Sequence, residues 1–176
     1  MRDTVPEHRK EKGMLRYIMM TASVIAGDGI LKKRAEKELA DNKSKRILGE
    51  RIRIHLLHNP GAALGVWKDH PSYLLALNSV MLGAVCGFFA HLFTKKGNVV
   101  AKTGLALAIG GGVSNLWDRI RRGYVTDYFS IHLGERFARL ESVVFNVSDV
   151  CIILGLLGSL FMKKEDASQG EAPHDC

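Results

Sequence analysis

The sequence predicts an α-helical integral membrane protein with four membrane-spanning helices in a single domain. The chain has 176 residues, a length that suits one domain. Its charged residues are concentrated at positions 1–54, 94–102, 118–141 and 163–175, and long apolar stretches alternate with them. The mean hydropathy of +0.02 is therefore an average over two kinds of segment. Apolar runs of about 20 residues are long enough to cross the hydrocarbon core of a bilayer.

The first predicted span covers residues 14–31, with Arg16 near its start and Asp28 near its end. A basic flank followed by an apolar core is also typical of a secretory signal. Asp28, and the absence of an Ala-x-Ala-like cleavage site before a soluble domain, favour a retained span instead. The preceding residues 1–13 are polar and mostly charged, and we expect them to form a flexible tail.

The connector after the first span is predicted to contain a helix and a strand pair. Residues 31–46 are rich in charge and in helix formers but lack a wide apolar face, which favours a solvated or interfacial helix continuing from the span. Residues 52–57 alternate loosely between apolar and polar, as in a strand, and Pro60, Gly61 and Gly65 indicate a turn after them. We expect a short strand pair on the membrane surface.

The other three spans are predicted at residues 73–93, 99–117 and 143–162. The first of these has no formal charge, and we interpret its Asn78 as a packing or interfacial group. The last carries one charge, Asp149. Residues 118–142 are predicted to form an amphipathic connector, and the acidic residues 163–176 a disordered tail. Small residues in the span at 99–117 would let a neighbouring helix approach closely, namely Gly104, Ala108, Gly111 and Gly112.

The formal charge of +7 would suggest a nucleic-acid partner if the protein were soluble. Because the basic residues flank predicted spans, we expect membrane lipids as partners, with anionic headgroups favoured, and no nucleic acid. Four spans would place both termini on one side. With the termini inside, however, the outer connectors carry more Lys and Arg than the inner segments, so the charge distribution favours the opposite orientation.

The sequence gives no reason to expect a metal or a cofactor. The three cysteines, Cys86, Cys151 and Cys176, do not have the spacing of metal ligands, and the seven histidines form no HExxH pattern. The GGG run at 110–112 is not followed by the Lys-Ser/Thr pair that a phosphate-binding P-loop requires. We therefore expect chemistry that depends on protein side chains alone.

Three polar residues, Asn115, Asp118 and Arg119, lie at the end of the third span. Spacings of three and four residues place them on one face of a helix end. Arg119 can bind a carboxylate or a backbone carbonyl through its planar guanidinium group. We expect Asp118, which has arginines beside it, to stay ionised and to act as a structural partner.

Asp127 and Asp149 differ from Asp118 because neither has an adjacent cation in the sequence. Asn146 and Asp149 are three residues apart and are expected on one helical face, with Asp149 about 9 Å inside its span. Two carboxyl groups that share a site hold one proton between them. Such a pair can activate water with its ionised member and protonate a carbonyl oxygen with the other. We hypothesise that Asp127 and Asp149 meet as a catalytic pair.

Other functions fit the same residues. Acids at membrane depth also hold helices together or line the path of a proton or an ion. From spacing alone, passage of an ion or a proton is favoured over peptide-bond chemistry. The alternative function is therefore a small non-enzymatic membrane protein, either a transporter or an assembly factor. A scaffold that binds anionic lipids is a third alternative, in which Asp127 and Asp149 would have no role.

Four motifs together resemble the lipoprotein signal peptidase (signal peptidase II) family. They occur in the family's order as DGILK at 28–32, HNPGAALGV at 58–66, GGGVSNLWDRIRRGYVTDYF at 110–129 and FNVSD at 145–149. The resemblance, which covers roughly residues 14–162, implies a four-helix aspartyl endopeptidase of the bacterial inner membrane with cytoplasmic termini. Members remove the signal peptides of diacylglyceryl-modified prolipoproteins by cutting before the lipidated cysteine, at the extracytoplasmic side of the membrane.

The resemblance also assigns roles to individual residues. Asp127 and Asp149 correspond to the catalytic acids, and no metal or cofactor is implied. The family's extracytoplasmic β-rich cradle and membrane-surface helix correspond to the segments near 50–70 and 128–142. The residues that line and support the site are Asn59, Gly61, Asn115, Asp118, Arg119 and Asn146, together with Asp28 and Lys32 of the first span.

The chain departs from the family pattern at a few positions. Leu64 replaces the usual Phe of the second motif, Thr126 an apolar residue before the first catalytic acid, and Ser148 an Ala before the second. The charged segment at 33–53 is longer than is typical of the family, and the Lys/Arg distribution opposes the family orientation. These differences concern substrate fit and loop geometry, whereas both acids are present.

Overall fold

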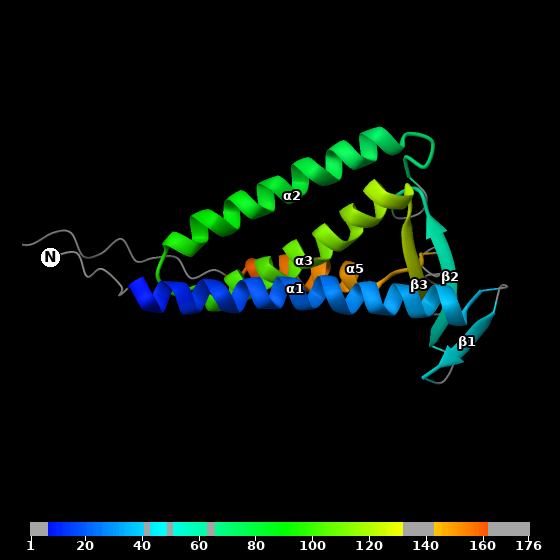
Figure 1. Ribbon diagram of the computed structural model, residues 1–176, viewed down its shortest axis with the longest axis horizontal. Helices are drawn as coiled ribbons and strands as arrows, with labels where there is room; N and C mark the ends of the chain where they lie inside the picture. Colours follow the sequence, from blue (N-terminus) through cyan, green and yellow to red (C-terminus); the bar gives the residue numbers. More distant parts are fainter. Residues whose placement is uncertain (1–6, 41–42, 49–50, 63–65, 132–142, 162–176) are drawn as a thin grey trace, which may run out of the picture.

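The computed structural model describes residues 7–40, 43–48, 51–62, 66–131 and 143–161. Within these ranges the chain forms four helices and a three-stranded antiparallel sheet, and the sheet lies at one end of the helices (Figure 1). The elements in chain order are α1 (Glu7–Glu38), β1 (Ser44–Ile47), β2 (Ile52–Asn59), α2 (Pro71–Thr94), α3 (Val99–Arg122), β3 (Val125–Ile131) and α5 (Val147–Ser159).

Three helices are long and apolar enough to cross a membrane, at Glu11–Glu38, Pro71–Thr94 and Val99–Arg122. They confirm the first three predicted spans, with longer bounds. The fourth prediction, at 143–162, was wrong at its start, because α5 begins at Val147 and Phe145 forms a β-bridge with Phe129. At 1.5 Å per residue the 13 residues of α5 extend about 20 Å, less than the hydrocarbon core.

The ends of α1 differ from the prediction. Residues 7–13, predicted as part of a flexible tail, are helical, since their Glu and Lys residues are good helix formers that extend the first span. The helix continues to Glu38 as expected, but residues 44–46 were wrongly predicted as helix. They belong to β1, which pairs with β2 so that Lys45 faces Ile54 and Ile47 faces Ile52. Pairing in the sheet overrides local helix propensity here.

The sheet has the order β1-β2-β3, and both strand pairs are antiparallel. The strand predicted at 52–57 is confirmed as β2. Residues 128–131, which were assigned to a membrane-surface helix, lie in β3 instead, because this segment pairs with β2. In this pairing Leu57 of β2 lies opposite Asp127 of β3. The remainder of that predicted helix, 132–142, lies outside the described residues. The pairing places Asp127 near Asn59 at the end of β2.

Helix α3 is central and contacts α1, α2 and α5. The predicted small residues permit this packing, because a Cβ atom added at Gly104 or Gly111 would collide with the α5 backbone at Gly155 or Ser148. The two helices are antiparallel, since residue 104 lies beside 155 and residue 111 beside 148. Their close approach brings Asn115, one turn beyond Gly111, to the beginning of α5.

The sheet is attached to the end of α1 by a small apolar core. Ala35 of α1 and Leu39, just after the helix, form a buried cluster with Tyr128 of β3, against which Ile54 and Phe129 pack. The Tyr128 hydroxyl also accepts a hydrogen bond from the backbone N–H of Val147, at 3.1 Å. Tyr128 therefore connects the sheet both to α1 and to the beginning of α5, where the polar site lies.

Candidate active site

Asp127 and Asp149 come together through one asparagine. Asp127 lies in β3, and Asp149 in the first turn of α5. The side-chain amide of Asn146 donates a hydrogen bond to Asp127 Oδ1 at 2.7 Å, and its Oδ1 accepts one from the backbone N–H of Asp149 at 3.0 Å. The backbone N–H of Asn146 in turn donates to Asp149 Oδ2 at 3.0 Å. Asn146 is fully buried and therefore fixes both carboxyl groups relative to each other.

The FNVSD motif forms the N-terminus of α5 as a capping box. Asn146 is the N-cap and Asp149 the third helical residue, and each side chain binds the other's backbone N–H. The prediction that both residues lie on one helical face was therefore wrong, because Asn146 precedes the helix. The depth predicted for Asp149, about 9 Å inside its span, was also wrong, because Asp149 lies in the first turn of α5. A spacing of three residues fits a capping box as well as a helix face, and the cap places Asp149 at the end of the helix nearest β3.

Asn115 of α3 holds the second carboxyl group. Its amide nitrogen donates to Asp149 Oδ1 at 2.8 Å, while its oxygen accepts from Lys32 Nζ at 3.0 Å and from the Asn146 amide at 3.2 Å. Because Lys32 can only donate, its contact fixes which end of the Asn115 amide is oxygen. Lys32 thereby orients the N–H group that binds Asp149.

Asn59 binds the other carboxyl group at the end of β2. Its amide donates to Asp127 Oδ2 at 3.0 Å, and its oxygen accepts from the backbone N–H of Gly61 at 3.0 Å. Arg119 donates to the carbonyl oxygen of Gly61 at 3.0 Å, and thus holds the turn after β2 against α3. The turn predicted at Pro60 and Gly61 is therefore part of the site, whereas Leu64 and Gly65 lie outside the described residues.

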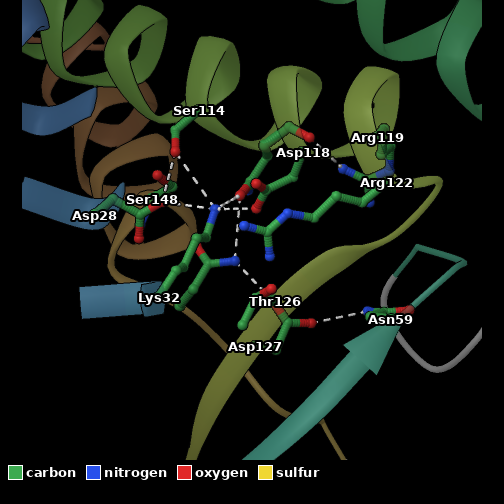
Figure 2. A network of polar contacts seen from close by, with 12 residues as sticks. Asp28, Lys32, Asn59, Ser114, Asp118, Arg119, Arg122, Thr126, Asp127 and Ser148 are labelled. Atoms are coloured by element: carbon green, nitrogen blue, oxygen red, sulfur yellow. Dashed lines mark hydrogen bonds and ion pairs between the residues drawn. The ribbon is translucent and has the colours of Figure 1, made fainter. Parts of the chain in front are cut away.

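A separate ionic cluster lies beside the two acids (Figure 2). Lys32 Nζ is 2.7 Å from Asp28 Oδ2 and 2.8 Å from Asp118 Oδ2, and all three side chains are buried. Ser114 donates to Asp28 at 2.6 Å, and the backbone N–H of Ser148 donates to the same carboxylate at 3.3 Å. The structural role predicted for Asp118 fits this geometry, but its partner is Lys32, on α1.

Two groups of residues in the network were not singled out in the sequence. Ser114 lies four residues before Asp118, so helical spacing could have placed it in the ionic cluster. Glu36 pairs with Arg122 and accepts a hydrogen bond from the buried Thr126 hydroxyl at 2.9 Å. The hydroxyl of Thr126, a departure from the family pattern, thus has a partner on α1. No sequence signal predicts this contact, because it joins residues 90 positions apart.

Burial and a neighbouring charge raise the pKa of Asp127 from 3.8 to about 6. Burial is the main cause, since Asp127 is only 3% exposed, and the charge of Asp149 is the second. Hydrogen bonds from Asn59 and Asn146 and the charge of Lys32 oppose the increase. Asp127 therefore keeps its proton to a higher pH than an ordinary Asp, as expected for one member of a pair that shares a proton.

Two cavities lie beside Asp149, and one of them also contacts Asp127. One, of about 220 Å³, is lined by Asn59, Asn115, Arg119, Asp127 and Asp149 together with apolar residues of the 143–153 segment. The other, of about 240 Å³, also reaches Asn115, Arg119 and Asp149 and extends between α2, α3 and α5 along apolar side chains. Within the described part of the chain, no three His, Cys, Asp or Glu residues are grouped as metal ligands would be. Side chains that can exchange protons thus border an apolar space.

A family model described as "Signal peptidase (SPase) II" matches residues 20–163. The chain belongs to this family. Lipoprotein signal peptidases are among its relatives, including one from Clostridium tetani that is 32% identical over 141 residues, which are 79% of this chain and 86% of that protein. Another, from Chlorobium luteolum, is 33% identical over 147 residues, which are 81% of this chain and 87% of that protein.

Solved structures support the same fold for this signal peptidase II. A bacterial membrane enzyme superposes with a TM-score of 0.68 at 20% sequence identity, covering 85% of this chain and 93% of the other. A second bacterial membrane enzyme superposes with a TM-score of 0.67, also at 20% identity, covering 82% and 90%. All four motifs quoted above, and every residue of the site, lie within residues 20–163, the region that the family model matches.

Proposed function

We propose that Asp127 and Asp149 are the catalytic acids of this signal peptidase II. The chain is an aspartic-type peptidase that cleaves signal peptides from prolipoproteins. The observation that carries the assignment is the side chain of Asn146, which is hydrogen-bonded to the Asp127 carboxyl group and to the backbone of Asp149. This arrangement holds two carboxyl groups at the edge of a cavity of about 220 Å³.

In the proposed reaction the pair begins with one shared proton. The ionised carboxylate takes a proton from a water molecule as the water oxygen attacks the scissile carbonyl carbon, and the protonated carboxyl group donates its proton to the carbonyl oxygen. The tetrahedral diol then collapses: one hydroxyl proton returns to the pair, the leaving nitrogen is protonated, and the C–N bond breaks. One water molecule is consumed, and the pair recovers its single proton.

The surrounding residues support the acids in this proposal. Asn59, Asn115 and Asn146 orient the carboxyl groups through neutral amides, which bind them without fixing their charge. Arg119 holds the Gly61 carbonyl and with it the turn that borders the cavity. The ionic cluster of Asp28, Lys32 and Asp118 keeps Asn115 in position through the contact between Lys32 and the Asn115 oxygen.

We further propose that the substrate carries a diacylglyceryl group and is cut before the lipidated cysteine. The cavity between α2, α3 and α5 supports this, because it joins Asp149 to apolar walls that fit acyl or other apolar chains. Membrane lipids would surround the helices, whose outer faces expose large apolar side chains such as Val80, Ile153 and Leu157. The lipid would remain in the bilayer while the scissile bond lies beside Asp127 and Asp149.

The proposed location is the bacterial inner membrane, with one domain, four spans and the site facing outward. The beginning of α1 and the end of α5 lie opposite the sheet, as expected for termini on one side (Figure 1). α5 would be the fourth span, and the sheet would be the cradle at the outer surface. The Lys/Arg distribution opposes this orientation, so the accessibility of Cys176 to an impermeant thiol reagent in intact cells tests it: labelling would contradict cytoplasmic termini.

The catalytic assignment is tested by cleavage of a lipidated prolipoprotein by the purified protein in detergent. We expect Asp127→Asn and Asp149→Asn each to lower kcat by at least about 10³-fold, because each removes a proton-transfer group. Asp69→Asn, at an exposed acid in the turn before α2, is the matched control and should cleave normally. Cleavage at the wild-type rate by Asp127→Asn or by Asp149→Asn would contradict the assignment.

A further inference from the structure

Asn78 is a polar residue on the inner face of α2. Asn78, Met81, Leu82 and Val85 follow helical spacing and all line the cavity of about 240 Å³ between α2, α3 and α5. Leu82 marks the contact with α3, because a Cβ atom added at Gly112 would lie 3.1 Å from Leu82 Cδ1. Asn78 is one turn from this contact and is the polar member of an otherwise apolar set.

The amide of Asn78 is costly in this position. Its Nδ2 atom is buried and has no hydrogen-bond partner among the described residues. A buried amide donor without a partner is unfavourable, and a polar residue within an apolar span is by default a candidate functional group. An apolar residue would pack against α3 equally well, so helix packing does not account for Asn78. Its earlier interpretation as a packing group therefore lacks support in the structure.

The same cavity reaches Asp149, one of the two proposed catalytic acids. Asp149, Asn115 and Arg119 line it at one end, while Ile152 and Leu156 of α5 and Val85 of α2 make its apolar wall. A substrate that places its scissile bond beside Asp149 and an apolar chain along α5 would pass Asn78. Asn78 is thus at the boundary between the polar and the apolar parts of the cavity.

We propose that Asn78 binds the prolipoprotein by donating a hydrogen bond to one of its carbonyl oxygens. The inference deepens the proposed function and rests on it. A carbonyl oxygen accepts hydrogen bonds but does not donate them, so it matches the unpartnered N–H donor of Asn78. Rotation of the amide by 180° exchanges its nitrogen and oxygen without changing the shape of the side chain, so either orientation of the amide can be reached. Two groups of the substrate offer this chemistry: a peptide carbonyl near the cleavage site, and an ester carbonyl of the diacylglyceryl group.

Two synthetic lipopeptides with one peptide sequence separate these sources. One carries a diacylglyceryl group with ester linkages, and the other a dialkylglyceryl group with ether linkages and no lipid carbonyl. Each is cleaved by the wild-type protein and by Asn78→Leu. The control is Ser79→Leu, which places the same side chain on the same helix at an exposed residue whose hydroxyl binds the Leu75 carbonyl oxygen.

We expect Asn78→Leu to raise KM for the ester substrate about five- to tenfold, the effect of one neutral hydrogen bond. We expect kcat to be preserved and the thermal midpoint to be unchanged or higher, because the substitution removes a buried donor without a partner. An increase in KM for the ester substrate alone identifies the lipid ester as the acceptor. An equal increase for both substrates identifies a peptide carbonyl. Unchanged KM for both would overturn the proposal, as would a fall in kcat at constant KM, or an equal effect of Ser79→Leu.

Failure of this inference can be told apart from failure of the proposed function. If the wild-type protein cleaves neither lipopeptide, or if the Asp127→Asn variant cleaves them as well as the wild type does, the catalytic assignment fails. If wild-type cleavage depends on Asp127 but Asn78→Leu leaves both KM values unchanged, only the role of Asn78 fails. A lower thermal midpoint for Asn78→Leu would show that Asn78 stabilises the fold, and would also contradict the proposal.

Discussion

Two sets of buried acids lie side by side in this protein and are stabilised in different ways. Asp28 and Asp118 share the ammonium group of Lys32, with N–O distances of 2.7 and 2.8 Å. Asp127 and Asp149 are bound by the amides of three asparagines, and no described Lys or Arg forms an ion pair with either. A shared cation favours the charged state of a carboxylate, whereas neutral amides can bind a carboxyl group in either its ionised or its protonated state. The first set is therefore suited to structure and the second to proton transfer.

Removing the cation should produce the largest change in stability. Lys32→Met would leave Asp28 and Asp118 buried without compensation, and we expect it to lower the free energy of unfolding by about 3–5 kcal/mol. Thermal unfolding in detergent measures the effect. The control is Lys33→Met, at an exposed neighbour, which should unfold like the wild type. Equal midpoints for the two variants would show that the ionic cluster does not stabilise the fold.

Removing the asparagine between the acids should mainly affect catalysis. Asn146→Ala deletes the hydrogen bond to Asp127 and the N-cap of α5, so we expect kcat to fall about 10²–10³-fold, as when a positioned hydrogen-bond donor is lost, and stability to fall by about 1 kcal/mol. Asn146→Ser retains an oxygen suited to capping. It should recover the thermal midpoint but not kcat; recovery of both would mean that Asn146 acts only as a cap.

A smaller effect is expected on the pH dependence of cleavage. The hydrogen bond from Asn59 lowers the pKa of Asp127, which is about 6. Asn59→Ala should therefore raise the apparent pKa of the limb of the kcat/KM profile that reports Asp127, by less than about one unit. Ser114→Ala, which removes a hydrogen bond from the ionic cluster, should leave this limb in place. A downward shift in Asn59→Ala would contradict the proposed contact.

The sequence predicted those parts of the site that depend on helical spacing. Asn115 and Arg119, four residues apart, lie together at the end of α3. Asp28 and Lys32, which the family resemblance assigned to the site, form an ion pair. Three of the spans were also identified, because an apolar run of sufficient length is a local property. The family motifs indicated which acids to examine, and the structure brings both to the wall of one cavity.

Features that depend on distant pairing were not predicted. β3 forms because it pairs with β2, and Leu57 and Asp127 are separated by 70 positions in the chain. The capping box was missed because its spacing is also that of a helix face. Ser114 is four residues from Asp118, so its place in the ionic cluster could have been predicted, but its hydrogen-bond partner, Asp28, is on α1. The contact between Thr126 and Glu36 joins residues 90 positions apart and has no sequence signal. In each case the information lies in a tertiary contact.

The comparison between the two sets of acids predicts opposite effects on stability. The folded-state pKa of Asp127, about 6, exceeds its ordinary value of 3.8, so the folded protein binds this proton more tightly than the unfolded chain. The stability that results is present below about pH 4 and is lost as the pH rises through 6. At pH 8 the ionised Asp127 therefore lowers the free energy of unfolding, whereas the ion pair between Asp118 and Lys32 raises it.

The most direct test measures cleavage and the thermal midpoint of Asp127→Asn and Asp118→Asn at pH 8. We expect Asp127→Asn to lose at least about 10³-fold in kcat and to unfold at the wild-type temperature or above, while Asp118→Asn unfolds several degrees lower. Retained cleavage by Asp127→Asn would contradict the catalytic role of Asp127. A midpoint for Asp127→Asn as low as that of Asp118→Asn would contradict the distinction between the two sets.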